Sequence, residues 1–241
     1  MNKIITYDTI RNFAYVNDNV CKKPIKGVVV YFCGLGKKDM FEEDTNEGIY
    51  YGEEGVLYVH PYNNPWSWMN AQAVAYTDEI LDVVFAHFDL PDSTPVISMG
   101  QSMGGLASLV YTRYAKRTPV ACIANCPVCD LVYHFTERPD LPRTIYSALW
   151  NEDGDIGEAM KKYSPVHLAP TMPDAKYYIF HCDKDKSVNL GRHSEKFVEA
   201  MKECGKDVEL EIIHDRGHCK LTFAANGKRL RLAFDYIGGA K

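Results

Sequence analysis

The sequence has no apolar run that approaches the length of a transmembrane helix. Its opening stretch, MNKIITYD, lacks the apolar core and the small-residue cleavage site of a secretion signal. No run of Lys and Arg is long enough to form a basic patch, and the formal net charge is −5. These absences favour a cytoplasmic protein that binds neither nucleic acid nor membranes.

The eight cysteines are scattered and form no dense framework of the kind that stabilises small secreted domains. A chain of 241 residues can bury a large core without disulfides or metals, so we expect free thiols. The sequence also lacks internal repeats, low-complexity segments and linkers. We therefore expect one domain over residues 1–241, and a homo-oligomer is compatible with this composition.

Apolar runs typical of strands alternate with amphipathic stretches typical of helices. Strands are expected at 28–32, 56–59, 96–99, 120–124, 177–181 and 208–213, and helices at 70–87, 106–114, 192–204 and 228–237. Residues 3–16 resemble one or two antiparallel edge strands. This alternation predicts an α/β fold with a mostly parallel central sheet flanked by helices. Residues 125–170 are too long for a simple crossover, and we expect them to form a small cap-like insertion over the active site.

A short apolar strand runs directly into the motif G-x-S-x-G at residues 100–104, and a helical pattern follows. This is the context that a nucleophile elbow requires, because the sharp turn holds one hydroxyl clear of the backbone. Gly100 and Gly104 leave room for the adjoining strand and helix. We predict that Ser102 is a nucleophile; the alternative is a βα turn with an incidental serine.

A serine hydroxyl needs a base, and the base needs an orienting acid. His218 is the favoured base because it follows the last strand in a loop with Gly217; His214 is the alternative. Two acids, Asp183 and Asp185, lie in the loop after the strand at 177–181. Either carboxylate could hold the imidazole and stabilise its charged form.

A developing oxyanion needs two backbone donors. The N–H of Met103, directly after the nucleophile, should be one of them. The second should come from the glycine-rich loop after the strand at 28–32, where Leu35 and Gly36 are both candidates.

The motif GQSMG at 100–104, the spacing of four from His181 to Asp185, and the pair Gly-His at 217–218 resemble the α/β-hydrolase superfamily. The second half of the chain is similar to the prolyl-oligopeptidase-like serine hydrolases and related esterases. The resemblance implies an α/β-hydrolase fold and a Ser-His-Asp triad, and it favours Asp185 over Asp183 as the acid. In that family the oxyanion loop and the acid loop commonly begin with His-Gly. Here they begin with Cys33-Gly34 and His181-Cys182, which leaves the second oxyanion donor less defined.

We therefore expect a serine hydrolase that cleaves carboxylic esters of small acylated molecules, acylated carbohydrates among them, without a cofactor or a metal site. The aromatic loop with Trp66 and Trp68 should line the substrate pocket, unless these rings only pack or cap the core. A chain of this length has no room for the propeller domain of true oligopeptidases, which weakens the alternative of a small serine peptidase acting on short peptides. Two further alternatives are a thiol oxidoreductase built on Cys126 and Cys129, and a non-catalytic ligand-binding protein.

Overall fold

The computed structural model describes residues 4–152 and 154–239, and their strands form one seven-stranded sheet. The strands are β1 (Ala14–Val16), β2 (Gly27–Phe32), β3 (Val56–Pro61), β4 (Val96–Gln101), β5 (Ala121–Asn125), β6 (Lys176–Cys182) and β7 (Val208–Ile213). They lie in the order β1-β3-β2-β4-β5-β6-β7, and β1 is antiparallel to β3 whereas the other pairs are parallel. The mostly parallel sheet predicted from the sequence is confirmed.

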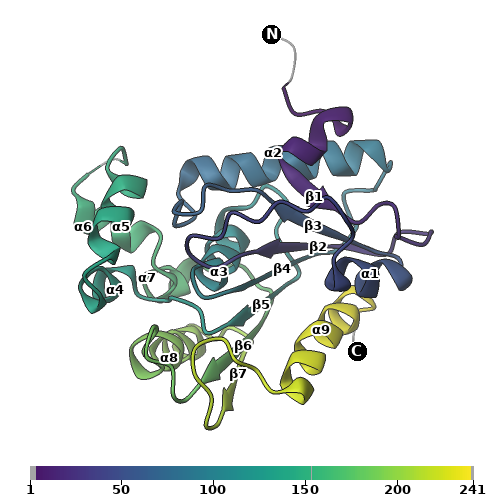
Figure 1. Cartoon of the computed structure of the whole chain (residues 1–241). Coiled ribbons are helices and arrows are strands. Elements are labelled where there is room, and N and C mark those ends of the chain that lie inside the picture. The colour runs from purple at the N-terminus through teal and green to yellow at the C-terminus, as the bar shows by residue number, and fades with distance from the viewer. Residues whose placement is uncertain (1–3, 153, 240–241) are drawn as a thin grey trace.

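Helices cover both faces of the sheet (Figure 1). Helices α2 (Ala71–His87), α3 (Met103–Tyr114) and α8 (Lys196–Glu203) belong to the larger hydrophobic core on one face. Helices α1 (Asn46–Glu53) and α9 (Phe223–Ile237) belong to the smaller core on the other face. No helix within residues 4–152 and 154–239 is long and apolar enough to cross a membrane.

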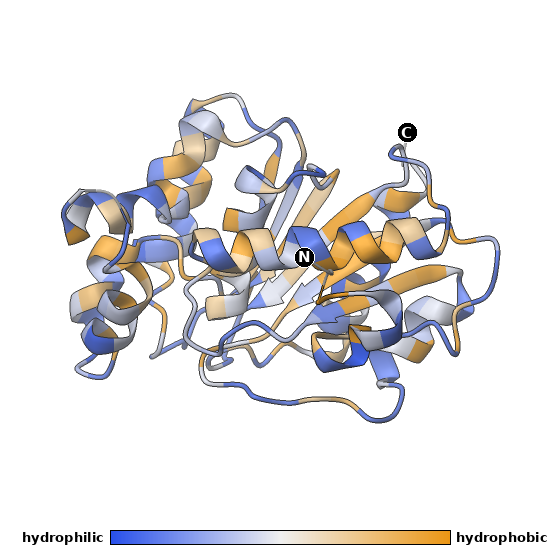
Figure 2. Ribbon diagram, turned by 90° about the horizontal axis from the view of Figure 1, so that it is seen from above, coloured by the Kyte–Doolittle hydropathy of each residue, from blue (hydrophilic) through white to orange (hydrophobic). Residues whose placement is uncertain are grey.

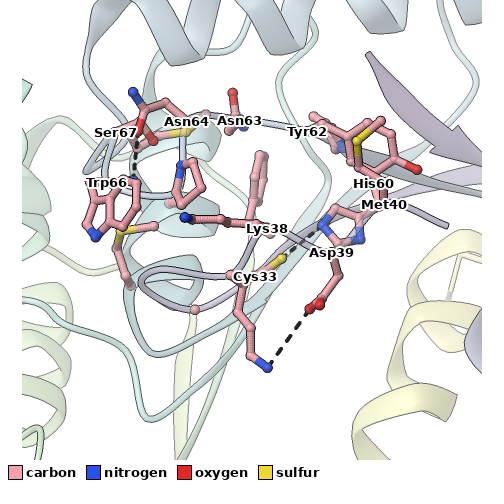
Figure 3. A pocket seen from close by; sticks show the side chains of 18 residues that line it. Cys33, Lys38, Asp39, Met40, His60, Tyr62, Asn63, Asn64, Trp66 and Ser67 are labelled. Carbon is pink, nitrogen blue, oxygen red and sulfur yellow. Dashed lines mark hydrogen bonds and ion pairs between the residues drawn. The ribbon is translucent and has the colours of Figure 1, made fainter. Parts of the chain in front are cut away.

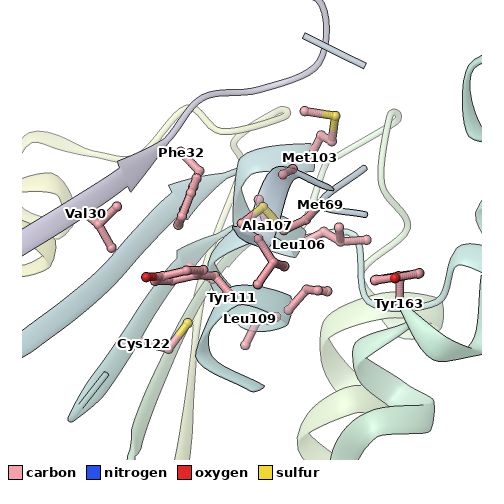
Figure 4. Close-up of a cluster of buried hydrophobic side chains, with 14 of the residues drawn as sticks. Val30, Phe32, Met69, Met103, Leu106, Ala107, Leu109, Tyr111, Cys122 and Tyr163 are labelled. Carbon is pink, nitrogen blue, oxygen red and sulfur yellow. The ribbon is translucent and has the colours of Figure 1, made fainter. Parts of the chain in front are cut away.

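The central strands are apolar along much of their length because both of their faces are covered (Figure 2). All five residues of β5 are buried, as are five of the six residues of β2. On the larger core, Phe32 of β2 packs against the ring of Tyr111 in α3, with ring centroids 5.5 Å apart (Figure 4). This contact ties the helix that follows the nucleophile motif to the strand beside it.

Two terminal segments differ from the sequence prediction. Between residues 3 and 16 only β1 is a strand; residues 7–12 form a 3₁₀ helix, and residue 3 lies outside the described residues. The 3₁₀ helix begins there because Thr6 and Thr9 cap each other reciprocally. The C-terminal helix α9 begins at Phe223 because the hydroxyl of Thr222 accepts the N–H of Ala225 at 3.1 Å. Phe223 is 98% exposed, so apolar periodicity could not reveal this first turn.

The predicted helix at 192–204 consists of a π-helical turn, Gly191–Glu195, which leads into α8. The described residues between β5 and β6, which exclude residue 153, hold four short helices and a 3₁₀ turn. They are α4 (Leu131–Glu137), α5 (Leu141–Leu149), α6 (Ile156–Lys162), α7 (Pro165–Leu168) and the turn Ala169–Thr171. The insertion at 125–170 is therefore helical, and its function as a cap stays a prediction.

The register of the sheet brings the functional loops to one edge. Phe32 of β2 lies beside Gly100 of β4, and Gly100 lies beside Ala124 of β5. Cys182 of β6 lies beside Ile213 of β7. Because parallel strands share one direction, the loops that follow β2, β4, β6 and β7 all leave the sheet at its carboxyl edge, where ligands bind in open α/β sheets.

Gly104→Ala should prevent folding or destabilise the protein by roughly 3 kcal/mol or more. A Cβ at this position would lie 2.1 Å from the carbonyl oxygen of Phe32, which is backbone and cannot rotate away. Gly217→Ala is the matched control, because a Cβ there meets nothing within 4 Å. Thermal unfolding of both variants checks the expectation, and equal melting temperatures would contradict it.

Candidate active site

Ser102 lies in the turn between β4 and α3 and has backbone angles of φ 58° and ψ −125°. A non-glycine residue with positive φ is strained, and such strain persists only where the surroundings fix the backbone. Here the N–H of Ser102 donates to the carbonyl of Asn125 at 2.9 Å, and its carbonyl accepts the N–H groups of Gly105 and Leu106. The backbone is therefore held on both sides, as in the predicted nucleophile elbow.

The structure brings Ser102 and His218 together, although they are far apart in the sequence. The Nε2 atom of His218 lies 2.8 Å from the Ser102 hydroxyl, and its Nδ1 atom lies 2.6 Å from Oδ2 of Asp185. Because ionised Asp185 can only accept, Nδ1 carries the proton and Nε2 offers its lone pair to the hydroxyl. This is the geometry that a general base for a serine nucleophile requires.

The Asp185 carboxylate is fully buried and uses both of its oxygen atoms. Oδ1 accepts the N–H groups of Ser187 and Val188 at 2.8 and 3.0 Å, and Oδ2 accepts from His218. Burial alone would raise the pKa of Asp185, but these hydrogen bonds and the neighbouring imidazole outweigh it and lower the pKa. Asp185 is therefore held in its charged form and in a fixed orientation.

The same interaction acts on the histidine. Burial is the largest single influence on the pKa of His218 and lowers it, but several raising interactions together outweigh it, the hydrogen bond to Asp185 first among them. That bond, the carboxylate charge and the Cys126 sulfur together raise the pKa to about 9. The imidazolium that forms when a base takes a proton is thus stabilised at this position.

The rival histidines occupy other environments. His181 is fully buried: its Nδ1 lies 2.7 Å from the Ser194 hydroxyl and its Nε2 lies 3.1 Å from the carbonyl of Val188. Since both nitrogen atoms are engaged, His181 supports the loop that carries the acid rather than serving as a base. His214 pairs with Asp183 at 3.1 Å, and its side chain is 77% exposed. The structure thus places Asp185, not Asp183, beside His218.

The candidate oxyanion donors lie in the loop after β2 and at the start of α3. A Cβ on Gly34 would lie 3.6 Å from the Cβ of Ser102, so this loop passes close to the hydroxyl. The N–H of Gly36 already donates to the carbonyl of Pro65 at 2.9 Å. Because this hydrogen bond occupies the N–H of Gly36, Leu35 is favoured over Gly36, and the pair Leu35 and Met103 stays a prediction.

A pocket of about 290 Å³ opens over Ser102. Ser102, His218, Leu35, Met103 and Trp68 line it, together with residues that sequence reasoning did not assign: Lys37, Val128, His134, Arg138 and Val188. The Trp68 side chain borders the pocket but is fully buried, and its Nε1 donates to the Thr144 hydroxyl at 3.2 Å. This burial fits the alternative that the ring packs in the core, and contact of Trp68 with substrate stays a prediction.

Trp66 lies along a second pocket, of about 300 Å³, on the other side of the loop after β2 (Figure 3). The two pockets share Gly34, Lys37 and Met103 in their walls. In the second pocket the thiol of Cys33 lies 2.9 Å from Nε2 of His60. Trp66 is not among the residues that line the Ser102 pocket, so its predicted contact with substrate finds no support there.

Glu137 fastens α4 to the loop that carries the acid. Its Oε2 lies 2.6 Å from Nδ1 of His134 and 3.0 Å from Nε2 of His193, and its Oε1 accepts the N–H of Asn189 at 3.1 Å. Burial raises the pKa of Glu137, but the two histidine hydrogen bonds outweigh it and hold the pKa well below its usual range. His134, which lines the pocket, is thereby held in place by a charged partner.

Cys126 and Cys129 do not form the redox pair considered from the sequence. Both side chains are fully buried, and burial is the main reason for the raised pKa of Cys129. The pKa of Cys126 is raised as well. A redox-active thiol requires the opposite, an accessible sulfur with a lowered pKa.

Residues 70–240 match the sequence profile of the prolyl oligopeptidase family. Among curated proteins, none matches the chain. The chain is similar to two solved structures for which the match covers 93% of this chain and 88% of the other chain. They are an S-formylglutathione hydrolase from Agrobacterium tumefaciens (TM-score 0.70, 17% identity) and esterase 2 of Thermogutta terrifontis (TM-score 0.65, 19% identity).

It is also similar to an acylaminoacyl peptidase from Pyrococcus horikoshii, with a TM-score of 0.69 and 15% identity. That match covers 90% of this chain but only 38% of the peptidase, so the chain spans less than half the length of that relative. These likenesses confirm the predicted α/β-hydrolase fold. Because the family profile matches most of the sequence and the Ser-His-Asp constellation lies within the matched residues, the protein belongs to the prolyl oligopeptidase family of serine hydrolases.

Proposed function

We propose that the protein hydrolyses carboxylic esters of small acylated molecules through an acyl-enzyme. The observation that carries this proposal is the unbroken series of hydrogen bonds from Ser102 to His218 to Asp185, at 2.8 and 2.6 Å. In this proposal the Ser102 oxygen attacks the ester carbonyl while His218 takes its proton. The same histidine then gives the proton to the departing alcohol.

The remaining groups act on charge and orientation. Asp185 stabilises the imidazolium, and the N–H groups of Leu35 and Met103 donate to the oxyanion of each tetrahedral intermediate. A water molecule activated by His218 then hydrolyses the acyl-Ser102 ester and returns the enzyme to its starting state. No step in this sequence requires a cofactor.

Two observations support an ester over a peptide as the substrate. The solved structures of similar length carry the names esterase and S-formylglutathione hydrolase, whereas the similar peptidase is far longer than this chain. The pocket over Ser102, at about 290 Å³, suits a small acyl group. The family profile keeps a small serine peptidase as the second candidate. Acylated carbohydrates stay one substrate class within the proposal.

Ser102→Ala should lower the turnover of a short-chain p-nitrophenyl ester by about 10⁶-fold, because no other hydroxyl can form the acyl-enzyme. It should also abolish labelling by a fluorophosphonate probe and leave the circular dichroism spectrum unchanged. Comparison of short-chain esters with aminoacyl and prolyl amides separates the two candidate activities. Turnover retained in the variant would overturn the nucleophile, and faster cleavage of amides than of esters would favour the peptidase.

The rate should depend on pH through His218, because only the neutral imidazole can take the serine proton. With the pKa raised to about 9, kcat/KM should climb with pH and reach half of its plateau near pH 9, above the ordinary 6.5. Asp185→Asn removes the main raising interaction, so the midpoint should move toward or below 6.5 while the rate falls about 10⁴-fold. Asp183→Asn, which alters the carboxylate beside His214, is the control and should leave the midpoint in place. A wild-type midpoint at or below 6.5 would contradict this expectation.

The pocket should favour esters that carry a negative charge. Lys37 and Arg138 line it; Lys37 lies 3.9 Å from Asp39, whereas Arg138 is hydrogen-bonded to Asp140 through two nitrogen atoms. Lys37→Met should lower kcat/KM for a hemisuccinate ester relative to its neutral isostere by about threefold, the size expected of an exposed charge. Lys38→Met is the matched control, because Lys38 lines only the neighbouring pocket. Equal losses for the charged and the neutral ester would exclude this preference.

A further inference from the structure

We propose that Cys126, His218 and Cys219 form a binding site for Zn²⁺ or another thiophilic divalent ion, and that binding switches catalysis off by occupying Nε2 of His218. Metal binding is independent of the proposed function, whereas the inhibition rests on it. One ligand atom from each of the three residues lies within 4.8 Å of the others. Two cysteines and one histidine are the donors that Zn²⁺ takes in many protein sites.

The spacing between the accessible donors suits a tetrahedral ion. Sγ of Cys219 lies 3.5 Å from Nε2 of His218. Bonds of about 2.0 Å to nitrogen and about 2.3 Å to sulfur, at a tetrahedral angle, set an N···S separation of roughly 3.6 Å.

His218 is already oriented as metal-ligating histidines are. Its Nδ1 donates to the buried carboxylate of Asp185, so the lone pair of Nε2 points away from the acid and toward the pocket. A carboxylate behind a histidine fixes the tautomer and raises the basicity of the nitrogen that binds a metal. The interaction that prepares His218 to take a proton therefore also prepares it to bind a cation.

The sulfur of Cys126 faces two backbone donors, although the pKa of this thiol is raised on balance. It accepts the backbone N–H groups of Cys182 and Cys219, each at 3.4 Å. Donors aimed at a sulfur stabilise its thiolate, which is the form that binds metal. Cys126 itself has a φ of 45° immediately after β5, a strained conformation that sets its side chain beneath the histidine loop. Each thiol releases one proton to solvent when the ion binds.

The pocket gives an ion access to this site. Cys219 is half-buried and lines the same pocket as Ser102 and His218, whereas Cys126 is fully buried and does not line it. Two other clusters of possible ligands occur in residues 4–152 and 154–239. In one of them His193 accepts two backbone N–H groups at Nδ1, so its Nε2 carries a proton and donates to Glu137. In the other, His181 is fully buried and does not line the Ser102 pocket.

Inhibition of the full-length enzyme by buffered free Zn²⁺ tests the proposal, with a phosphine reductant present so that no disulfide forms. Inhibition should be reversed by a chelator. Cys219→Ser should raise the Zn²⁺ concentration for half-inhibition at least about tenfold, with each variant measured against its own metal-free rate. Cys204→Ser, which alters an exposed cysteine outside the pocket, is the matched control and should behave as the wild type. Equal inhibition of the wild type and Cys219→Ser would overturn the proposal.

A second measurement does not depend on activity. Ser102→Ala protein titrated with Cd²⁺ should develop the ultraviolet charge-transfer absorbance of a cadmium thiolate, saturating at one ion per chain. The band should be lost or halved in the variant that also carries Cys219→Ser. A missing band in Ser102→Ala would refute the metal site but would not bear on the proposed hydrolase function. A band together with a wild type that has no esterase activity would support the metal site and refute the proposed function.

Discussion

The hydrogen bond between Ser102 and His218 joins residues 116 positions apart, and most of the described structure serves to keep it short. Ser102 is fixed because β4 ends where the backbone of α3 begins, with Gly100 and Gly104 nearly touching. His218 is fixed by Asp185, whose own carboxylate is held by two backbone N–H groups of its loop. Each of these constraints depends on backbone geometry or on a buried charge. Distorting the backbone or removing the partner of the charge would cost a large amount of free energy.

Local sequence predicted the parts of the site that depend on local geometry. The elbow needs only a strand, a turn that tolerates no side chain at Gly100 or Gly104, and a helix, and all three are contiguous. Asp185 could be chosen over Asp183 only through the family resemblance, because both acids lie on the same loop. Their separation in space comes from their partners: Asp183 pairs with His214, and Asp185 pairs with His218.

The pocket walls could not be predicted because they depend on how distant segments pack. His134 reaches the pocket from α4, and Arg138 directly follows this helix, whose apolar pattern is too brief to orient its faces. Helix α1 escaped notice for a related reason: it is largely polar and is fixed by the cap of Thr45 on the N–H of Gly48. Trp66 and Trp68 are two residues apart in sequence, yet they line different pockets, since a loop can send near neighbours in opposite directions.

One buried carboxylate, that of Glu137, links the insertion to the rest of the site. It holds His134 in the pocket wall, His193 in the turn before α8 and the N–H of Asn189 just beyond the acid loop. Lifting α4 away would carry Glu137 with it and break its hydrogen bonds to His193 and to the N–H of Asn189, so His193 would lose its charged partner. Motion of α4 is therefore coupled to the segment that follows the acid loop, beside the pocket that Lys37 and Arg138 line.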